Sequence, residues 1–224
     1  MIFHNMKPVR IFLAGDSTMG NYGWEQAPRA GWGQFLSCYL PSPIQICNHA
    51  ASGRSSKSFI AEGRLAAIEA EINKGDFLFI QFGHNDQKLD EERHTEPFDS
   101  FKYCLNEYIE VARRHGATPL LITAVQRRCM NECGILKDTH GDYNLAMIEL
   151  AEAKNVVLID LGEWSRKLIE GMGIESSKSM FLWLTPGEHP NYPDGIEDNT
   201  HFSEFGARTI ASWVAQQVQE KLRL

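Results

Sequence analysis

The chain has 224 residues, 43% of them hydrophobic and 23% charged, which is typical of a globular protein and enough to bury the core of one α/β domain, expected over residues 1–224. The net charge of −7 argues against general nucleic-acid binding, and no apolar stretch approaches the ~18 residues that cross a membrane. The first residues, "MIFHNMKPVR", contain no apolar segment long enough for a signal peptide, so a cytoplasmic location is expected unless a leader precedes this sequence.

Five apolar segments predict the strands of one sheet. They are residues 9–14, 44–48, 77–82, 119–125 and 156–160. Runs such as "FLFIQF" and "VVLID" are apolar throughout rather than alternating, as is typical of strands buried on both faces. We therefore expect a five-stranded parallel sheet that is covered by helices on both sides.

Helical periodicity occupies the segments between and after these strands. The periodic segments are residues 63–75, 98–116, 143–155 and 203–222. Glycines end the first two, and Ser203 is the expected N-cap of the last. This order predicts the α/β class, specifically a three-layer α/β/α sandwich. Residues 127–142 and 171–200 show no periodicity and are predicted to be long functional loops.

Small and polar residues follow three of the predicted strands and precede the last helix. The four segments are "GDST" at 15–18, "NHAASGRSS" at 48–56, "GHND" at 83–86 and "DNTH" at 198–201. Ligands of an open parallel sheet bind beyond the carboxyl ends of its strands, so we expect all four segments at one edge.

A nucleophile and its base are present among these segments. The hydroxyl of Ser17 needs a base to remove its proton, and the imidazole of His201 is the candidate. Asp198 lies three residues earlier and is expected to hold the His201 ring through its Nδ1–H. The oxyanion of an acyl-transfer intermediate would be bound by the backbone N–H of Ser17, the backbone N–H of Gly53 and the side-chain amide of Asn85.

Other interpretations of the same motifs remain open or fail on spacing. An isolated "GDST" is also a common turn. Cys129 and Cys133 with His140 form a loose, incomplete metal-ligand set, so no metal is expected. "SGRSSKS" is not a phosphate loop, and "GDSTMG" is not a G-x-S-x-G elbow. The histidines outside the motifs are interpreted as surface or packing residues, while His84 stays a candidate substrate contact because it precedes Asn85.

The four motifs in this order resemble the SGNH superfamily of serine esterases, also called GDSL-like hydrolases. The strings "GDSTM", "GWGQFL", "NHAASGRSSKSFIAEGR", "FIQFGHND" and "DNTHFSEFGA" are similar to rhamnogalacturonan acetylesterases within that superfamily. The resemblance implies a flavodoxin-like sandwich, no cofactor and release of acetate from sugar hydroxyls. It also implies catalytic roles for Ser17, Asp198 and His201, and oxyanion roles for Ser17, Gly53 and Asn85.

The expected partner is an acetylated oligosaccharide of the pectin type. Trp183 and Tyr192, in the predicted loop before "DNTH", are candidate platforms for sugar rings, whereas Trp32 and Trp164 are expected to pack internally. An acidic sugar would favour Arg54, with Lys57 beside it, as an ion-pair partner, although Arg54 is equally suited to cap a loop or to bridge to Asp86.

Three further functions compete with this prediction. The first is a xylan or small-glycoside acetylesterase, and the second is a lipid esterase or thioesterase of the same superfamily. The third is a carbohydrate-binding or flavodoxin-like cofactor-binding protein without turnover. Oligomeric state leaves no recognisable pattern in the sequence.

Overall fold

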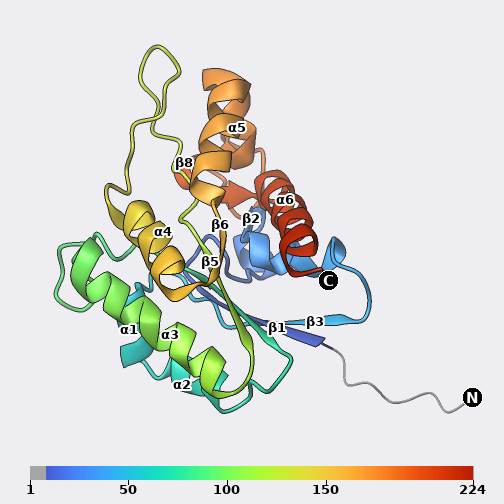
Figure 1. The fold of residues 1–224 in the computed structure, drawn as a ribbon. Coiled ribbons are helices and arrows are strands. Elements are labelled where there is room, and N and C mark those ends of the chain that lie inside the picture. The colour runs from blue at the N-terminus through green and yellow to red at the C-terminus, as the bar shows by residue number, and fades with distance from the viewer. Residues whose placement is uncertain (1–8, 224) are drawn as a thin grey trace, which may run out of the picture.

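A central sheet of five parallel strands organises the computed structural model, which describes residues 9–223 (Figure 1). The strands are β1 (Val9–Gly15), β3 (Ile44–Asn48), β4 (Phe77–Gln81), β5 (Thr118–Ile122) and β6 (Val157–Ile159). Their spatial order is β3–β1–β4–β5–β6, so the second strand of the sheet lies outside the first. This order is that of flavodoxin-like folds, and it places a topological switch point between β1 and β4.

Helices cover both faces of this sheet. The α-helices are α1 (Ser56–Ala61), α2 (Arg64–Glu69), α3 (Lys102–Arg114), α4 (Tyr143–Lys154), α5 (Leu161–Ser176) and α6 (Glu204–Leu222). Short 3-10 or π-helical segments are η1 (Trp24–Gln26), η2 (Trp32–Cys38), η3 (Pro97–Phe101) and η4 (Ser177–Met180). Residues of α1 to α4 pack on one face, and residues of η2, α5 and α6 pack on the other.

The alternation of side chains along β1 shows how two cores arise from one strand. Ile11 and Leu13 belong to the core under α5 and α6, whereas Phe12 and Ala14 belong to the core under α1 to α4. All four are fully buried, which accounts for the unbroken apolar runs in the sequence. The predicted three-layer sandwich with a five-stranded parallel sheet is confirmed.

The helix predicted over residues 63–75 differs in its bounds. Two short helices, α1 and α2, occupy residues 56–69, and Gly63 stands between them with a φ of 73°. That left-handed backbone is one that glycine adopts without steric cost. The helical spacing of Leu65 and Ile68 is therefore confirmed, but it belongs to the second helix, α2, alone.

A second, three-stranded sheet was not predicted. Its strands are β2 (Arg29–Ala30), β8 (Ile196–Ser203) and β7 (Phe181–Leu184), in that spatial order and antiparallel. The prediction of a long loop over residues 171–200 is therefore wrong, because this stretch contains the end of α5, η4, β7 and the first part of β8. Residues 127–142 form a long loop between β5 and α4, as predicted, and an isolated β-bridge joins Met130 to Leu136 within it.

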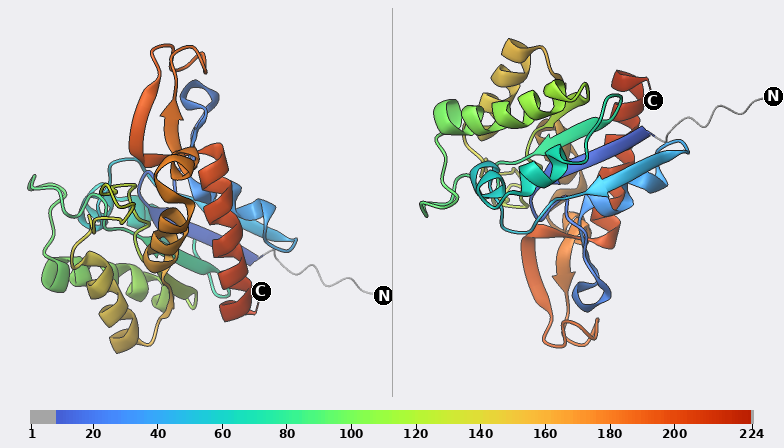
Figure 2. Two further views of the ribbon diagram at one scale, coloured as in Figure 1. Left: turned by 90° about the horizontal axis from the view of Figure 1, so that it is seen from above. Right: turned by 90° about the horizontal axis from the view of Figure 1, so that it is seen from below.

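The hairpin of β7 and β8 projects from the body of the molecule with the η1 segment beside it (Figure 2). The side-chain amide of Asn191 donates to the carbonyls of Trp24 and Ala27, and the Tyr192 hydroxyl donates to the Gln26 carbonyl. The small sheet thus brings residues from both halves of the chain to one end of the central sheet.

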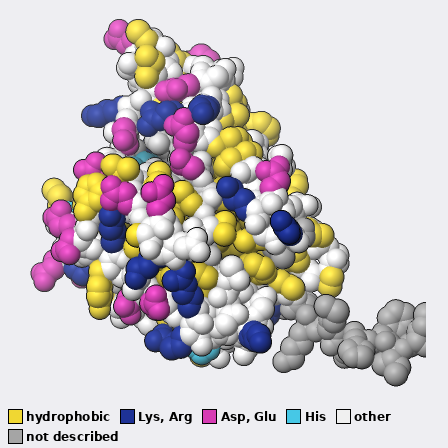
Figure 3. Space-filling view, in the orientation of Figure 1, with side chains coloured by type: hydrophobic (Ala, Val, Ile, Leu, Met, Phe, Trp, Pro, Cys, Tyr) yellow, Lys and Arg dark blue, Asp and Glu magenta, His cyan; other side chains and the backbone are white. Residues whose placement is uncertain are grey.

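Acidic and basic side chains are interspersed on the face shown in Figure 3. Within residues 9–223, no helix combines the length and apolar character needed to cross a membrane. The prediction about a signal peptide concerns residues 1–10, of which the first eight lie outside the described residues.

Candidate active site

Ser17 lies in the turn that follows β1, at the carboxyl edge of the central sheet. The turn begins at once because the Met19 N–H donates to the Asp16 carbonyl. A Cβ atom on Gly15 would lie 3.0 Å from the Gln81 carbonyl oxygen, so only glycine lets β1 and β4 approach this closely at the edge. Ser17 is 7% exposed.

A buried hydrogen-bond network holds this turn. The backbone N–H and hydroxyl of Thr18 donate to Asp16 Oδ1 at 2.9 and 2.8 Å, and the Gln81 amide donates to the Thr18 hydroxyl at 3.3 Å. The indole N–H of Trp32 donates to Gln81 Oε1 at 2.7 Å. Because Trp32 is fully buried, the expectation that it packs internally is confirmed. The network fixes the backbone on either side of Ser17.

His201 and Asp198 lie on β8 and face the turn. His201 Nε2 is 3.2 Å from Ser17 Oγ, and His201 Nδ1 is 2.6 Å from Asp198 Oδ2. The other carboxylate oxygen, Asp198 Oδ1, accepts the backbone N–H groups of Thr200 and His201 at 2.7 and 2.9 Å. The three side chains therefore form a continuous line from carboxylate to imidazole to hydroxyl, the arrangement used in nucleophilic acyl transfer.

These contacts stabilise the ionised form of the Asp198 carboxyl group. Burial alone would raise its pKa, but the hydrogen bonds from the His201 ring and from the two backbone N–H groups lower the pKa to about 2. Asp198 is thus a carboxylate across the neutral pH range and orients the Nδ1–H of His201.

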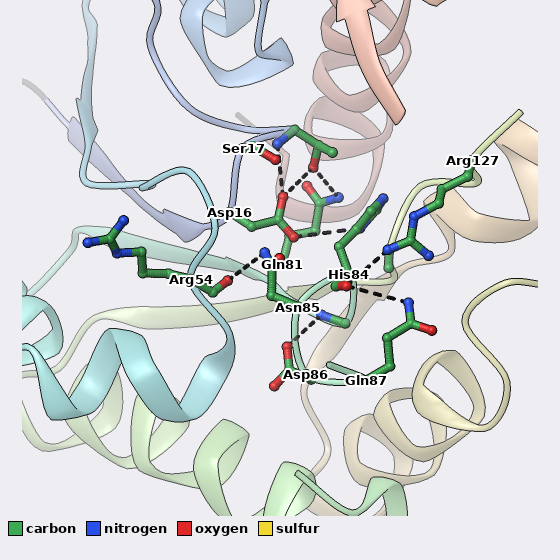
Figure 4. Close-up of polar contacts among 12 residues, drawn as sticks. Asp16, Ser17, Arg54, Gln81, His84, Asn85, Asp86, Gln87 and Arg127 are labelled. Atoms are coloured by element: carbon green, nitrogen blue, oxygen red, sulfur yellow. Dashed lines mark hydrogen bonds and ion pairs between the residues drawn. The ribbon is translucent and has the colours of Figure 1, made fainter. Parts of the chain in front are cut away.

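Gly53 and Asn85 approach Ser17 from two neighbouring loops. Gly53 has a φ of 80°, and neither its N–H nor that of Ser17 has a hydrogen-bond acceptor among the described residues. The Asn85 amide donates one hydrogen to the Arg54 carbonyl at 3.0 Å (Figure 4), and its second hydrogen has no acceptor in the described part of the chain. These groups are the type of donor that stabilises a developing oxyanion.

Asp86 ties the two loops together. Its Oδ1 accepts the backbone N–H of Ser56 at 3.0 Å and the hydroxyl of Ser56 at 2.5 Å, and its Oδ2 accepts the N–H of Gly83 at 3.0 Å. Burial raises the pKa of Asp86 to about 7 although these hydrogen bonds favour the carboxylate. The carboxyl therefore joins the segment after β3 to the segment after β4.

A cavity of about 450 Å³ opens at this edge of the sheet. It is lined by Ser17, Arg29, Ser52, Gly53, His84, Asn85, Lys88, Arg93, Arg127, Asp198, Thr200 and His201. All five residues predicted for catalysis or oxyanion binding thus meet in one place. His84, predicted as a substrate contact, also lines it.

Three of the residues predicted to contact the sugar do not line this cavity. The guanidinium of Arg54 pairs with Glu62 at 3.0 Å and extends away from Ser17 and His84 (Figure 4). It does not bridge to Asp86 either, since Ser56, Gly83 and the Thr95 hydroxyl donate to that carboxyl.

The two aromatic candidates are engaged elsewhere. The Trp183 indole donates to Asn199 Oδ1 at 2.9 Å and is covered by Arg128 and Lys178. The Tyr192 hydroxyl is held by the η1 segment. Trp164 stacks on Trp213 of α6 with 4.4 Å between ring centroids, as expected for internal packing.

His84 and His140 form a buried pair beneath the cavity. Their rings are 4.5 Å apart, and His84 Nδ1 lies 3.5 Å from Asp16 Oδ2. Burial, and after it the positive charge of Arg127, lowers the pKa of His84 well below its ordinary value, and burial lowers the pKa of His140 to about 3. Both rings are therefore neutral packing groups.

The cysteines considered as metal ligands are not gathered around a common centre. Cys129 and Cys133 are exposed, whereas His140 is buried. Over residues 9–223, His, Cys, Asp and Glu side chains do not form a group of three that could hold a metal ion.

Several cationic residues of the cavity were missed from the sequence, namely Arg29, Lys88, Arg93 and Arg127. Arg29 reaches the cavity through the pairing of β2 with β8, a contact between residues far apart in the chain. Lys88 lies only three residues after Asn85, so its position beside a predicted donor loop was the one signal available.

Comparison with known families and proteins supports these observations. A sequence model described as "GDSL-like Lipase/Acylhydrolase family" matches residues 13–209. The chain is 48% identical over 214 residues to "Rhamnogalacturonan acetylesterase RhgT" of Bacillus subtilis (strain 168), which covers 96% of this chain and 91% of that protein. It is 44% identical over 211 residues to "Probable rhamnogalacturonan acetylesterase YesY" of the same organism, which covers 94% and 92%.

Among solved structures, the protein YXIM of Bacillus subtilis superposes with a TM-score of 0.80 at 28% sequence identity. The match covers 96% of this chain but 57% of that one, so the chain spans little more than half the length of YXIM.

Proposed function

Because the chain belongs to the GDSL-like lipase/acylhydrolase family, we propose that it is a carbohydrate O-acetylesterase that uses Ser17 as nucleophile. The distance of 3.2 Å between Ser17 Oγ and His201 Nε2 is the observation that carries the proposal. The names of the two curated relatives favour acetylated rhamnogalacturonan oligosaccharides as substrates. Residues 1–224 are proposed to act as one hydrolase domain, and the cytoplasmic location stays a prediction.

The proposed reaction begins with attack of Ser17 Oγ on the acetyl carbonyl while His201 Nε2 takes the hydroxyl proton. The bond between the acetyl carbon and the sugar oxygen breaks, His201 gives its proton to that oxygen so that the sugar leaves with a free hydroxyl, and the acetyl group remains on Ser17. A water molecule then attacks the acetyl carbon while His201 takes its proton; the bond to Ser17 Oγ breaks, His201 returns the proton to Ser17, and acetate leaves. The free N–H groups of Ser17 and Gly53 and the Asn85 amide are suited to bind both oxyanions.

The proposal is tested by acetate release from a panel of substrates. We expect release from acetylated rhamnogalacturonan oligosaccharides and a preference for acetyl over octanoyl esters of one alcohol. A preference for the octanoyl ester would favour a lipid esterase or thioesterase, and a preference for acetylated xylan fragments would favour a xylan esterase. No turnover of any ester would favour a binding protein.

Asn85→Ala is expected to lower kcat by about 10²–10³-fold with a smaller change in KM, because the lost amide acts on charge that develops in the transition state. The rate on a small acetyl ester measures this. Gln87→Ala is the matched control, since the Gln87 amide donates to the His84 carbonyl from the same loop. Loss of less than about threefold in Asn85→Ala would contradict the oxyanion role.

The rate is expected to fall in acid, because a protonated His201 cannot accept the proton of Ser17. The contacts that lower the pKa of Asp198 to about 2 keep that carboxyl ionised far into the acid range, so Asp198 does not cause the onset of the fall. The profile of kcat/KM against pH checks this. A profile that stays flat from neutral pH down to the pKa of Asp198 would exclude His201 as the base.

A further inference from the structure

Hydrogen bonds hold the peptide groups on both sides of Ser17. The Asp16 carbonyl, in the peptide group before it, accepts the Met19 N–H at 3.3 Å. In the peptide group after it, the N–H belongs to Thr18 and donates to Asp16 Oδ1 at 2.9 Å. The carbonyl of that same peptide group accepts the hydroxyl hydrogen of Tyr22 at 2.8 Å. Because a peptide group is planar, fixing both of them also fixes the direction in which the Ser17 N–H points toward an oxyanion.

Tyr22 is anchored separately from the turn that it holds. Its backbone N–H donates to Gln34 Oε1 at 3.1 Å, and its carbonyl accepts Gln34 Nε2 at 3.4 Å. Gln34 belongs to η2, whose Trp32 and Phe35 side chains are buried in the core under α5 and α6. The Tyr22 hydroxyl therefore carries a position set by the core to the peptide group that follows Ser17.

Arg29 determines where the hydroxyl hydrogen of Tyr22 points. Its guanidinium lies over the Tyr22 ring, 4.5 Å from the ring centroid, and its Nη2 donates to the Tyr22 hydroxyl at 3.0 Å. A guanidinium has no acceptor, so the hydroxyl oxygen accepts from Arg29 and keeps its single hydrogen for the Ser17 carbonyl. The positive charge of Arg29 strengthens that second hydrogen bond. Burial raises the pKa of Tyr22 even beside this charge, so the hydroxyl keeps its hydrogen at neutral pH.

The same guanidinium reaches the loop of a second oxyanion donor. Arg29 Nη2 also donates to the Ser52 hydroxyl at 3.4 Å, and Ser52 directly precedes Gly53. Arg29 thus connects the ring that holds Ser17 to the loop that supplies the Gly53 N–H. Donors stabilise an oxyanion well only when they converge on one point, so the relative position of these two loops matters for the rate.

We propose that Tyr22, supported by Arg29, is a positioning residue for the oxyanion donors: its hydroxyl sets the direction of the Ser17 N–H and thereby the stabilisation of the tetrahedral intermediate. This inference rests on the proposed function and deepens it, because it assigns part of the rate to a residue that takes no part in the proton transfers. A donor displaced by a fraction of an ångström loses much of its effect in the transition state.

A matched pair of substrates separates this role from a merely structural one. The pair is an acetyl ester and the thionoacetyl ester of the same alcohol, in which sulfur replaces the carbonyl oxygen. Sulfur is a weak hydrogen-bond acceptor, so the thionoester gains little from the oxyanion donors. Tyr22→Phe is expected to lower kcat about tenfold for the acetyl ester but less than about threefold for the thionoester, with KM for each within about twofold.

Tyr192→Phe is the matched control, because it also removes a tyrosine hydroxyl that donates to a backbone carbonyl, that of Gln26 at 3.1 Å. Unchanged rates on both esters are expected. Asn85→Ala removes an oxyanion donor itself and is expected to give the same selective loss on the acetyl ester. Arg29→Met removes the hydrogen bond to Tyr22 and is expected to give a smaller loss of the same kind, so it tests the inference if Tyr22→Phe folds poorly.

Equal losses on the two esters in Tyr22→Phe, or no loss on the acetyl ester, would overturn the inference. An effect confined to KM would overturn it as well, because it would place Tyr22 in substrate binding. The unmodified protein judges the proposed function separately. If it releases no acetate from the acetyl ester, the esterase proposal is refuted and the inference falls with it. Release by the unmodified protein, followed by equal losses in the variant, refutes the positioning role alone.

Discussion

Replacing Ser17 with alanine is expected to lower kcat for a small acetyl ester by at least ~10³-fold while the protein folds normally. The reason is that the attacking oxygen disappears and the rest of the cavity is retained. Over residues 9–223 the side-chain oxygen of Ser17 has one hydrogen-bond partner, His201, so its loss leaves the hydrogen bonds of the Asp16–Thr18–Gln81 network in place. Steady-state rates and the far-UV circular dichroism spectrum measure the two halves of this prediction.

Ser179→Ala is the matched control for this substitution. Ser179 is exposed, and its hydroxyl donates only to the Ser176 carbonyl, so full activity is expected. Retained activity in Ser17→Ala, with the variant folded, would remove Ser17 from the reaction and leave the geometry of His201 and Asp198 without a catalytic explanation.

Asp198→Asn is expected to lower kcat by about 10⁴-fold although the substitution is nearly isosteric. Asp198 Oδ1 accepts two backbone N–H groups, and the asparagine oxygen will keep that position. The amide nitrogen must then face His201 Nδ1 and donate to it. The ring proton moves to Nε2, which faces Ser17 Oγ and can no longer accept its proton.

Two measurements check this prediction. The kcat on a small acetyl ester gives the loss, and nitrogen NMR of the His201 ring gives the tautomer. Asp194→Asn is the control, because Asp194 is an exposed aspartate in the turn before β8. Activity within about tenfold of the unmodified protein in Asp198→Asn, or a ring that keeps its proton on Nδ1, would contradict the assigned role.

The central sheet could be predicted because burial on both faces leaves a strong local pattern. β4 and β5 carry apolar side chains at every position except Gln81 and Thr118, and a helix such as α6 is preceded by a polar N-cap residue. The Ser203 hydroxyl accepts the Gly206 N–H, as expected for the N-cap. The α5 helix was not recognised, since Gly171 and Gly173 interrupt its pattern and Gly173 has non-helical backbone angles.

The small sheet could not be predicted, for a physical reason. The β8 sequence "IEDNTHFS" has only one buried residue, Phe202, and its pairing with β2 joins Arg29 to Ser203. Strands that are stabilised by distant pairing and carry polar side chains lack the apolar run that identifies the central strands.

Site residues that follow strands of the central sheet could be predicted, whereas those that depend on the small sheet could not. Ser17, Gly53 and Asn85 follow strands of the central sheet, so the topology rule for parallel sheets predicts from the sequence alone that they meet at one edge. Arg29 depends on the small sheet and could not be recognised. The prediction for Trp183 and Tyr192 rests on their aromatic rings and on a loop expected before Asp198, but Asn199 and Gln26 accept the hydrogen bonds of their polar groups. The catalytic roles themselves stay predictions.

The most direct test of the central claim is the site at which a serine-reactive phosphonate attaches. The account predicts a single adduct on the peptide that contains Ser17, formed by the unmodified protein, absent from Ser17→Ala and formed much more slowly by Asp198→Asn. A protein that hydrolyses acetyl esters yet carries no adduct, or carries it on a residue other than Ser17, would contradict the account.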